Sequence, residues 1–578
     1  MLELVKNLKF AWRYVKGQKT KLILFAITNV IMAVIGVILP VLSAKMVVNL
    51  TSNELSQLIY ISIIIFIIEM IQNIIKFSND YFIQVIYRET FTNTQKALGT
   101  EILKLQNKTL DKNSSGVFIQ RLISDTGRLS SIFNNLTINL SNIISNIGIL
   151  VAVLIINVWA FLFLIFMLFV LIIVRIKESR VYNEKDKEFR KEEEKVSGFT
   201  GEVVRGARDI KMLNAENSFL RVMNEKIIML NQKRYKMMRV IRNYDLLGRS
   251  LLDFMDLVFI ILLVYLLVQK NLTIPLALVI YNYSGRTTSI IFSLDNLFRV
   301  VKDFNLSAKR IFDITLDKEF PKESFGNKHL SKVDGNFEFK DVNFSYGDNK
   351  VLDNLSFKID ANSTVAFVGK SGAGKSTIFS LIDKMYEVDS GEILIDGVNI
   401  NELDKDSIRN NITVINQNPY IFNLSIKDNL KLVKENLTDE EMINACKMAC
   451  LDEFINTLPD KYDTVVGEGG ITLSGGQKQR LAIARALIQK TEIILFDEAT
   501  SALDNETQKE IQEAIYNMQG EYTILIIAHR LSTIIDSDRI LFLNDGHIEA
   551  EGTHEELLDK SLAYKHLYET ELKTNTNN

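Results

Sequence analysis

The chain has 578 residues, of which 47% are hydrophobic and 24% are charged, and its formal net charge is −3. This length suggests more than one domain, and the nearly balanced charge gives no indication of nucleic-acid binding. Cys446 and Cys450 offer no disulfide framework, and their spacing of four residues predicts that they pack on one helix. The abundance of Ile, Asn and Lys is typical of an AT-rich genome, so we expect a bacterial source.

Apolar runs occupy the first three hundred residues, and each is long enough to cross about 30 Å of hydrocarbon. We expect six spans, near residues 22–44, 57–76, 138–156, 158–176, 246–268 and 274–294. Asn157 interrupts the nearly continuous apolar run from 147 to 174, which predicts a tight external turn between two spans. One long buried helix is the alternative for this run.

Positive charge predicts the orientation of these spans. Six basic residues precede the first span, namely Lys6, Lys9, Arg13, Lys16, Lys19 and Lys21. Because such residues stay on the cytoplasmic side, we expect the N-terminus in the cytoplasm. The connections near 45–56 and 269–273 are short and carry few charges, as external loops do. The two other connections, which comprise residues 77–137 and 177–245, are long and charged, so they should lie on the cytoplasmic side. Six spans then return the chain to the cytoplasm.

Two segments flank the predicted membrane domain, which comprises residues 1–318. At its start, residues 2–16 place apolar side chains at helical spacing with basic residues between them, which predicts an amphipathic helix at the membrane interface. After it, residues 319–334 carry a proline, a glycine and mixed charges, which predicts a linker. Alternating apolar and polar residues from 337 to 344 then open a second domain, 335–578, with a strand.

Ionisable and polar groups within the spans are costly and are usually functional or paired. The candidates for the wall of a central cavity are Glu69, Asp256, Tyr283 and Arg286. Counted at about 1.5 Å per residue from the outer helix ends, Glu69, Asp256 and Arg286 all lie about 18–20 Å deep. We therefore expect Glu69 or Asp256 to counter Arg286, with a structural ion pair that never touches cargo as the alternative. The polar residues in 281–289 indicate a water-lined face and an amphipathic cargo, such as a drug, lipid or peptide.

A glycine-rich segment of the second domain fits the P-loop pattern G-x-x-x-x-G-K-[ST], between a predicted buried strand and a predicted helix. Its members are Gly369, Lys370, Ser371, Gly372, Ala373, Gly374, Lys375, Ser376 and Thr377. The glycines allow successive N–H groups to surround phosphate oxygens. Lys375 would reach the β- and γ-phosphates and Ser376 would bind Mg²⁺, so ATP and Mg²⁺ are the expected ligands. A glycine-rich turn without phosphate is the alternative.

A second string in this domain indicates what the ATP is used for; it consists of Leu473, Ser474, Gly475, Gly476 and Gln477. Here the chain resembles the ATP-binding cassette (ABC) superfamily, of which this string is the signature. The resemblance implies an all-α six-helix transmembrane domain of the exporter type, followed by an α/β P-loop cassette. It also implies that the signature of one cassette closes over nucleotide on the P-loop of a second cassette.

The other cassette motifs follow in the family's order. An apolar strand ends in two carboxylates and matches Walker B, where Asp497 would hold Mg²⁺ and Glu498 would act as general base. The resemblance further implies that Gln417 senses Mg²⁺, that Tyr346 stacks on adenine and that His529 contacts the γ-phosphate. The D-loop would comprise Ser501, Ala502, Leu503 and Asp504. Taken singly, an acidic pair, a histidine or a tyrosine beside a glycine is usually structural.

The resemblance extends to both charged internal segments and to the N-terminal helix, which is similar to the elbow helix of ABC exporters. Residues 113–125 resemble the first intracellular loop of exporter half-transporters, and 202–216 resemble the second. Coupling helices that dock on the cassettes are therefore expected near 112–118 and 207–214, with a solvated charged helix as the alternative. The chain departs from the family pattern at Val465, where the loop before the signature usually has an acidic residue.

The leading hypothesis is an ATP-driven exporter half-unit in the cytoplasmic membrane, which works by alternating access as a homodimer or a heterodimer. Because Glu498 is present, we expect a hydrolytically competent transport ATPase. Its partners would be a second half-transporter, the lipid bilayer and a small amphipathic substrate, and no nucleic acid. The alternatives are an exporter-shaped siderophore importer and an ATP-gated channel or regulator, although the latter usually lacks the catalytic glutamate or an intact signature. Six spans with one cassette argue against a soluble cassette ATPase.

Overall fold

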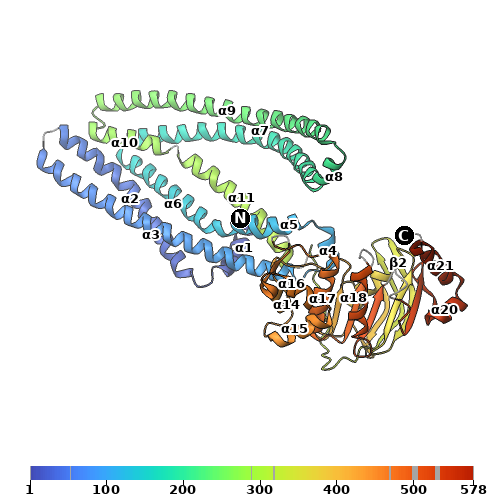
Figure 1. Cartoon of the computed structure of the whole chain (residues 1–578). Helices are drawn as coiled ribbons and strands as arrows, with labels where there is room; N and C mark the ends of the chain where they lie inside the picture. The colour runs from blue at the N-terminus through green and yellow to red at the C-terminus, as the bar shows by residue number, and fades with distance from the viewer. Residues whose placement is uncertain are drawn as a thin grey trace. The chain divides into compact units, whose positions relative to one another are not determined.

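The computed structural model describes seven stretches of the chain: residues 2–51, 54–287, 289–316, 319–467, 470–497, 505–527 and 534–576. These residues form two compact units (Figure 1). The first unit comprises residues 1–103 and 115–319, and the second comprises residues 104–114 and 320–578. A short segment from the first third of the sequence therefore belongs to the same unit as the C-terminal half.

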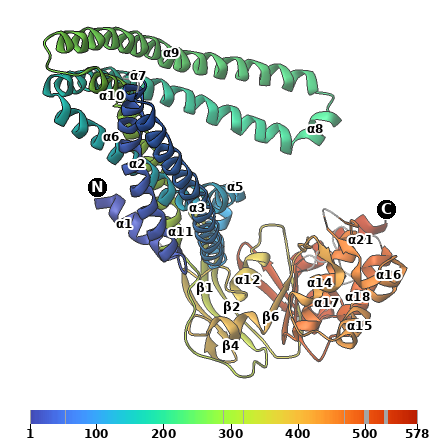
Figure 2. The ribbon, with the colours of Figure 1, turned by 90° about the vertical axis from the view of Figure 1, so that its left-hand side faces the viewer.

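The described part of the first unit is helical. Its elements are α1 (Leu2–Ala11), η1 (Trp12–Tyr14), α2 (Lys19–Thr51), α3 (Leu55–Ile102), α5 (Ser115–Gln120), η2 (Arg121–Asp125), α6 (Thr126–Ile156), α7 (Val158–Arg205), α8 (Ala207–Met212), α9 (Glu216–Val268), α10 (Ile274–Thr287) and α11 (Ser289–Thr315). Both views show α7 and α9 running side by side along their length (Figures 1 and 2). The α11 helix packs against α6, and α2 packs against α3.

Within the described residues, five helical stretches are long and apolar enough to cross a membrane. They are Lys19–Leu50, Leu55–Ile102, Ser115–Ile156, Val158–Arg205 and Glu216–Val268. The sixth span expected from the sequence falls on α10 and the start of α11, on either side of Thr288, which lies outside the described residues.

The expected turn at Asn157 separates α6 from α7. The backbone of Asn157 is extended, and its side-chain Oδ1 accepts hydrogen bonds from the N–H groups of Trp159 (3.0 Å) and Ala160 (3.1 Å). Asn157 is therefore the N-cap of α7, because its side chain satisfies amides that the first turn of a helix leaves without partners. The alternative of one continuous helix through this run is excluded.

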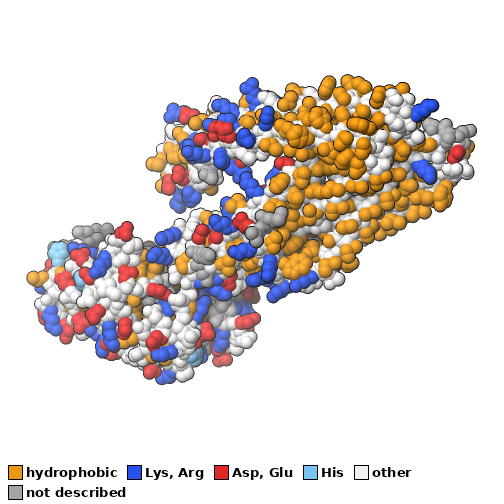
Figure 3. All heavy atoms as spheres, turned by 180° about the vertical axis from the view of Figure 1, so that it is seen from behind, with side chains coloured by type: hydrophobic (Ala, Val, Ile, Leu, Met, Phe, Trp, Pro, Cys, Tyr) orange, Lys and Arg blue, Asp and Glu red, His pale blue; other side chains and the backbone are white. Residues whose placement is uncertain are grey.

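Large apolar side chains are exposed along the spans, for example Ile63, Phe66 and Ile74 of α3. Figure 3 shows hydrophobic side chains covering most of one face of these helices, whereas Lys, Arg, Asp and Glu gather toward the helix ends. A soluble protein rarely exposes an apolar surface of this extent. The helical unit therefore presents to its surroundings a surface that lipid tails can solvate.

The second unit is built on two main sheets. Its described strands are β1 (Phe337–Tyr346), β2 (Asn349–Ile359), β3 (Thr364–Gly369), β4 (Ser390–Ile395), β5 (Val398–Asn399), β6 (Ile412–Ile415), β7 (Leu424–Ser425), β8 (Val465–Val466), β9 (Ile493–Asp497), β10 (Thr523–Ile527), β11 (Arg539–Asn544) and β12 (His547–Gly552). Four strands form an antiparallel sheet in the order β2-β1-β4-β5. The larger sheet has the order β12-β11-β3-β10-β9-β6 and is parallel except for β12.

Helices cover the larger sheet. The described helices of this unit are α4 (Asn107–Lys112), α12 (Lys375–Ile382), α13 (Lys405–Arg409), α14 (Ile426–Lys431), α15 (Asp439–Met448), α16 (Asp452–Thr457), η3 (Lys461–Asp463), α17 (Gly475–Gln489), α18 (Asn505–Tyr516), α20 (His554–Lys560) and α21 (Leu562–Thr576). Within this unit, β1, β2 and β4 lie together at one side, and α14 to α18 gather at the other (Figure 2).

The parallel strands are apolar on both faces because each face packs against a separate core. In β9, Ile494 and Phe496 belong to one hydrophobic cluster, whereas Ile493 and Leu495 belong to the other. This is the alternation expected of a strand covered on both sides, and it explains why the strand reads as an uninterrupted apolar run. Because β3, β10 and β9 are parallel neighbours, their carboxyl ends meet at one edge of the sheet, where open α/β sheets bind their ligands.

Candidate functional site

The P-loop has a backbone that only glycine adopts readily. Gly372 and Gly374 have φ values of +86° and +99°. At Gly369, a Cβ atom would lie 2.1 Å from the carbonyl oxygen of Leu543, and at Gly374 it would lie 2.6 Å from Cδ2 of Leu352. The loop is thus shaped by positions where a side chain would clash, and it leads directly into α12, which begins at Lys375.

Lys375 folds back over the loop that precedes it. Its side chain is in the core of the loop, with 5% of the residue exposed, and its ammonium donates to the carbonyl oxygens of Gly369 (2.8 Å) and Lys370 (2.9 Å). The positive charge is therefore held beside the backbone amides at the start of α12. Together they form a concave, positively polarised surface that fits phosphate oxygens.

Two oxygen-bearing side chains meet at the edge of the sheet although they are 121 residues apart in sequence. The Ser376 hydroxyl, in the first turn of α12, donates to Oδ1 of Asp497 (3.2 Å), which is the last residue of β9. A hydroxyl and a carboxylate this close to a phosphate cradle are the type of oxygen ligands that Mg²⁺ takes in nucleotide sites. The residues present therefore fit a bound Mg–nucleotide.

Gln417 follows β6, which pairs with β9 in the parallel sheet. Its carbonyl oxygen accepts a hydrogen bond from the side chain of Gln479 (3.1 Å), and Gln479 lies on α17, the helix that begins with the signature. The segment after β6 and the signature helix are therefore directly connected.

The signature residues form the start of α17. Ser474 is the N-cap: its hydroxyl accepts from the N–H of Gln477 (3.2 Å), and the Gln477 side chain accepts from the N–H of Ser474 (2.8 Å). This reciprocal arrangement fixes the first turn, while Leu473 anchors it in the core. Gly475 and Gly476 then add no side chain to the positive end of a 15-residue helix, which leaves room for an anion to approach.

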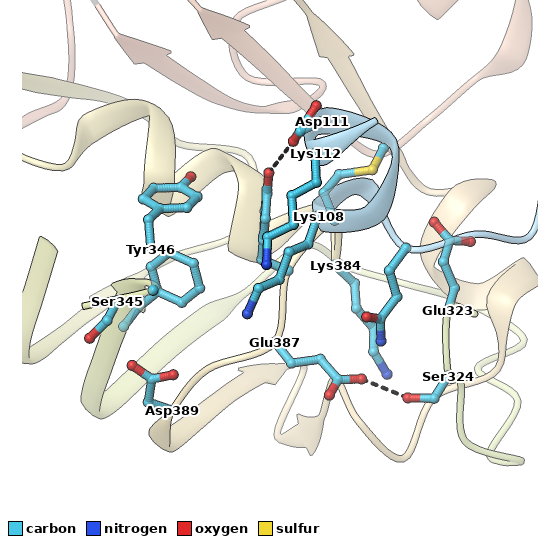
Figure 4. A pocket seen from close by; sticks show the side chains of 15 residues that line it. Lys108, Asp111, Lys112, Glu323, Ser324, Ser345, Tyr346, Lys384, Glu387 and Asp389 are labelled. Carbon is cyan, nitrogen blue, oxygen red and sulfur yellow. Dashed lines mark hydrogen bonds between the residues drawn. The ribbon is translucent and has the colours of Figure 1, made fainter. Parts of the chain in front are cut away.

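Tyr346, at the end of β1, stands in an aromatic cluster beside a cavity of about 750 Å³ (Figure 4). Its ring lies edge-on to Phe344 (centroids 4.8 Å apart) and to Tyr386 (5.2 Å), and 42% of Tyr346 remains exposed. The cavity is also lined by three lysines and four acidic residues, namely Lys108, Lys112, Lys384, Asp111, Glu323, Glu387 and Asp389. The exposed ring of Tyr346 offers an apolar face that suits the base of a nucleotide.

The α4 helix is attached to this cluster by side-chain and backbone contacts. The Tyr386 hydroxyl donates to Oδ2 of Asp111 (2.5 Å), as the dashed line in Figure 4 shows. Burial and the Asp111 carboxylate raise the pKa of Tyr386, so the phenol stays protonated and remains a donor at physiological pH. The segment 104–106 also pairs with the segment 321–323 through two backbone hydrogen bonds. The N–H of Gln106 donates to Pro321 O (3.0 Å), and the N–H of Glu323 donates to Lys104 O (2.8 Å).

Short helices lie at both segments where coupling residues were expected. The first segment, 112–118, includes the end of α4 (Asn107–Lys112) and the start of α5 (Ser115–Gln120). Asn113 ends α4 with an extended backbone, and its side chain donates to Thr109 O (2.8 Å), so the motif that begins at Asn113 separates the two helices. The second, α8, spans Ala207–Met212, within the expected 207–214.

Several expected site residues lie outside the described residues. These are Glu498, the four D-loop residues Ser501, Ala502, Leu503 and Asp504, and His529. The structure describes the strands that lead to them, β9 up to Asp497 and β10 up to Ile527. These two strands are parallel neighbours, with Ile527 opposite Asp497.

The four expected cavity residues occupy different environments in the first unit. Glu69 is exposed on α3, and Asp256 is half-buried on α9. Tyr283 lies in the helix core, where its hydroxyl donates to Val37 O (2.8 Å). Arg286 is exposed and donates to Gly36 O (3.0 Å); within the described residues of one chain, no ion pair joins it to Glu69 or Asp256.

Sequence reasoning missed two groups of residues that the structure brings together. One is the Tyr386–Asp111 pair, which is 275 residues apart in sequence and carries no local signal. The other is a row of asparagines on α6, Asn139, Asn142 and Asn146, which line a cavity with Arg286. Their spacing of three and then four residues places them on one helix face, and this signal was available in the sequence.

Comparison with known proteins agrees with this geometry. Residues 22–290 match the family described as ABC transporter transmembrane region, and residues 352–501 match the family described as ABC transporter. An "ATP-dependent lipid A-core flippase" of Mannheimia succiniciproducens is 32% identical over 527 residues, 89% of this chain and 88% of the relative. A protein of the same name from Pasteurella multocida is 30% identical over 581 residues, 98% of each chain.

These matches cover both units, and the order of the two families along the chain is the order predicted from the motifs. An ATP-binding cassette follows an apolar, multi-pass helical region, which is the arrangement of an ATP-hydrolysing transport protein. The chain therefore belongs to the ABC transporter family, as an exporter-type half-transporter whose membrane region precedes its cassette.

Proposed function

We propose that two half-transporters of this kind form an ATP-driven exporter that moves an amphipathic lipid across the bacterial cytoplasmic membrane. The observation that carries the proposal is the meeting of Ser376 and Asp497 beside the P-loop, in a chain whose helical unit exposes apolar faces. The lipid is inferred from relatives that are named lipid flippases. Residues 1–318 would form the membrane domain, 319–334 the linker and 335–578 the cassette, with the N-terminus and the cassette in the cytoplasm.

In this proposal, ATP is held by residues from several elements of one cassette. Tyr346 stacks on adenine, the amides of residues 369–377 surround the phosphates, and the Lys375 ammonium pairs with the β- and γ-phosphates. Ser376, Asp497 and Gln417 would hold Mg²⁺, which supplies a positive charge that neutralises the phosphates. Glu498 accepts a proton from the attacking water, and His529 donates to the γ-phosphate.

The signature of each cassette would act on the nucleotide of the other. The capping pair of Ser474 and Gln477 keeps the first turn of α17 rigid, so that Gly475 and Gly476 can approach a γ-phosphate on the partner's P-loop. Because every ATP-handling motif is present in this sequence, two copies would complete two sites. We therefore propose a homodimer. If the purified chain hydrolyses no ATP until a second, homologous chain is added, the assembly is a heterodimer.

Closure of the two cassettes would reach the membrane domain through α4 and α8. The α4 helix is attached by Asp111 to Tyr386, and the Tyr386 ring contacts the Tyr346 ring, so the adenine platform and α4 are joined through two contacts. Stabilisation of the closed cassettes by ATP then shifts the spans toward an outward-open state, and hydrolysis resets them.

The test is a lipid-translocation assay in vesicles that contain the purified chain with the cassettes on the outside. Fluorescent lipid in the outer leaflet, which is the cytoplasmic leaflet in this orientation, should become protected from an impermeant quencher when Mg–ATP is added. Glu498→Gln should lose protection and ATP turnover together, whereas the exposed Glu555→Gln serves as the matched control and should keep both. Movement of cargo toward the cassette side would indicate an importer, and ATP-dependent ion conductance without lipid movement would indicate a channel.

A further inference from the structure

The N-terminal segment, from α1 to the start of α2, presents two different faces. One face is buried in the membrane unit: Asn7, Ala11 and Val15 are at most 4% exposed. The other face carries exposed basic side chains, and each lies three or four residues from the next, which is the spacing of one side of a helix. We call these residues the N-terminal basic stripe: Lys6, Lys9, Arg13, Lys16 and Lys19.

The charge and the aromatic content of this segment indicate a membrane surface. Between residues 2 and 21, six residues are basic and one, Glu3, is acidic. Trp12 is 36% exposed beside the stripe, and the Lys19 ammonium lies 5.8 Å from the centroid of its ring. Lys19 also begins α2, which is long and apolar enough to cross a membrane. Tryptophan and lysine are typical of helix ends that lie where the hydrocarbon meets the headgroups.

The buried face attaches α1 to α11, against which it packs (Figure 2). The carboxamide Nδ2 of Asn7 donates to Oδ1 of Asn305 (2.8 Å). The ring of Phe10 meets the ring of Phe312 edge-on, with the centroids 3.9 Å apart. These two contacts are seven residues apart on α11, the last helix of the membrane unit, from which the chain continues to the cassette. A force that holds α1 in place therefore also restrains α11.

Anionic phospholipid is the partner that suits both the charge and the apolar part of the exposed face. The cytoplasmic leaflet attracts basic segments that lie beside a span, and each Lys or Arg near the headgroups favours anionic over zwitterionic lipid by about fivefold. Val5, which is 60% exposed, and Trp12 add apolar surface to the stripe. Acyl chains cover such a surface, whereas a nucleic acid or a free phosphate does not.

We propose that the N-terminal basic stripe binds anionic phospholipids of the cytoplasmic leaflet, and that these lipids stay with the protein and are not transported. Their binding holds α1 at the membrane surface. Because Asn7 and Phe10 attach α1 to α11, the same lipids support the helix from which the chain continues to the cassette. ATP turnover should therefore rise with the anionic lipid content of the bilayer. The inference does not depend on the proposed lipid export.

Quenching of Trp12 by brominated lipid measures contact at the stripe directly. The chain has two tryptophans, so Trp159→Phe leaves Trp12 as the only one. The full-length Trp159→Phe chain is placed in nanodiscs of phosphatidylcholine and phosphatidylglycerol, with one of the two lipids brominated near the headgroup end of its acyl chains. At equal content, brominated phosphatidylglycerol should quench Trp12 more strongly than brominated phosphatidylcholine. The two quenching curves give the constant for exchange of one lipid against the other at this site.

Two charge variants separate the stripe from the net charge of the chain. Lys9→Gln combined with Arg13→Gln should lower the exchange constant by about 25-fold, or about fivefold for each charge. Lys187→Gln combined with Lys191→Gln is the matched control, because these exposed residues of α7 are also four residues apart. They lie at least about 16 Å along the helix beyond the predicted span that ends at 176, so the constant should equal that of the parent chain. Imperfect folding changes quenching by both lipids and is removed by the comparison.

Phe10→Ala tests the second step, which is the support of α11. This change keeps every charge of the stripe and removes the ring that contacts Phe312. The exchange constant at Trp12 should stay at the parent value, whereas the rise of ATP turnover with phosphatidylglycerol content should be lost.

Equal quenching by the two lipids, or an unchanged exchange constant after Lys9→Gln with Arg13→Gln, overturns the binding of anionic lipid. An ATP turnover that is independent of phosphatidylglycerol content, or that rises equally in Phe10→Ala, overturns the support of α11. Loss of quenching when Mg–ATP is added would show that the lipid leaves during the cycle, which overturns its assignment as a resident lipid. Nanodiscs have no second compartment, so a failure of lipid export in vesicles leaves all of these measurements valid.

Discussion

The contact between Tyr386 and Asp111 gives the most direct test of how α4 is held on the cassette. Tyr386→Phe removes one hydroxyl and keeps the ring that packs against Phe344 and Tyr346. A hydrogen bond to a charged acceptor contributes about 1.5–3 kcal/mol, but Asp111 is exposed, so the value should lie at or below the lower end. We expect the free energy that holds α4 on the cassette to fall by about 1 kcal/mol, which makes the detached state of α4 about fivefold more populated.

Amide hydrogen exchange of residues 107–112 in the full-length chain measures this detachment, because exchange of a short helix follows its local opening. Tyr386→Phe should speed exchange there about fivefold and leave α12 unchanged. Asp111→Asn should have a similar effect, and the double variant should be no worse than either single one, since all three remove the same bond. Fully additive effects of the two changes would refute the inference that this bond attaches α4.

Three further predictions concern the cassette. Gly374→Ala should abolish ATP binding in a fluorescent-nucleotide titration, because the φ of +99° is strained for alanine and the new Cβ would lie 2.6 Å from Leu352 Cδ2. Asp497→Asn should retain nucleotide binding in EDTA but lose most of its enhancement by Mg²⁺, which a titration with and without the metal would show. Burial raises the pKa of Asp383 to about 6 despite its ion pair with Arg409 (2.7 Å). The folded state therefore holds this proton more tightly than the unfolded state, so the stabilising contribution of Asp383 is fully present below about pH 4 and is lost, by at most about 3 kcal/mol, as the pH rises to 6. Asp383→Asn should flatten that part of the melting-temperature profile, and an unchanged slope would contradict the burial argument.

The cassette was the more predictable part because its chemistry requires fixed residue types at fixed spacing. The glycines of the P-loop occupy positions that exclude a Cβ, and Ser376 and Asp497, both assigned to Mg²⁺ from sequence, lie 3.2 Å apart. The turn at Asn157 was also predicted, because an asparagine that interrupts a long apolar run can cap the helix that begins after it. In each of these cases a local requirement of the backbone or of a ligand restricts the choice of residue.

Contacts between distant segments could not be predicted from the same patterns. The position of α4 depends on the pairing of 104–106 with 321–323, and the motif that placed the coupling residues near 112–118 falls between the end of α4 and the start of α5. Tyr283 was assigned to a water-lined face because its neighbours are polar, whereas its ring lies in the helix core and only its hydroxyl finds a polar partner, Val37 O. A tyrosine satisfies both environments equally well, so its sequence neighbours do not decide between them.

Hydropathy explains why the cavity lined by the α6 asparagines and Arg286 was not predicted from the sequence. A window average identifies α6 as a span although Asn139, Asn142 and Asn146 share one of its faces, because the apolar residues of the other faces outweigh them. Each asparagine alone resembles an isolated polar residue that a span tolerates, and only their common face indicates a polar cavity. On that face, Asn139 accepts a hydrogen bond from Asn296 of α11 and Asn146 donates one to Ser289 of α11, so both keep α6 against α11, whereas Asn142 between them is exposed.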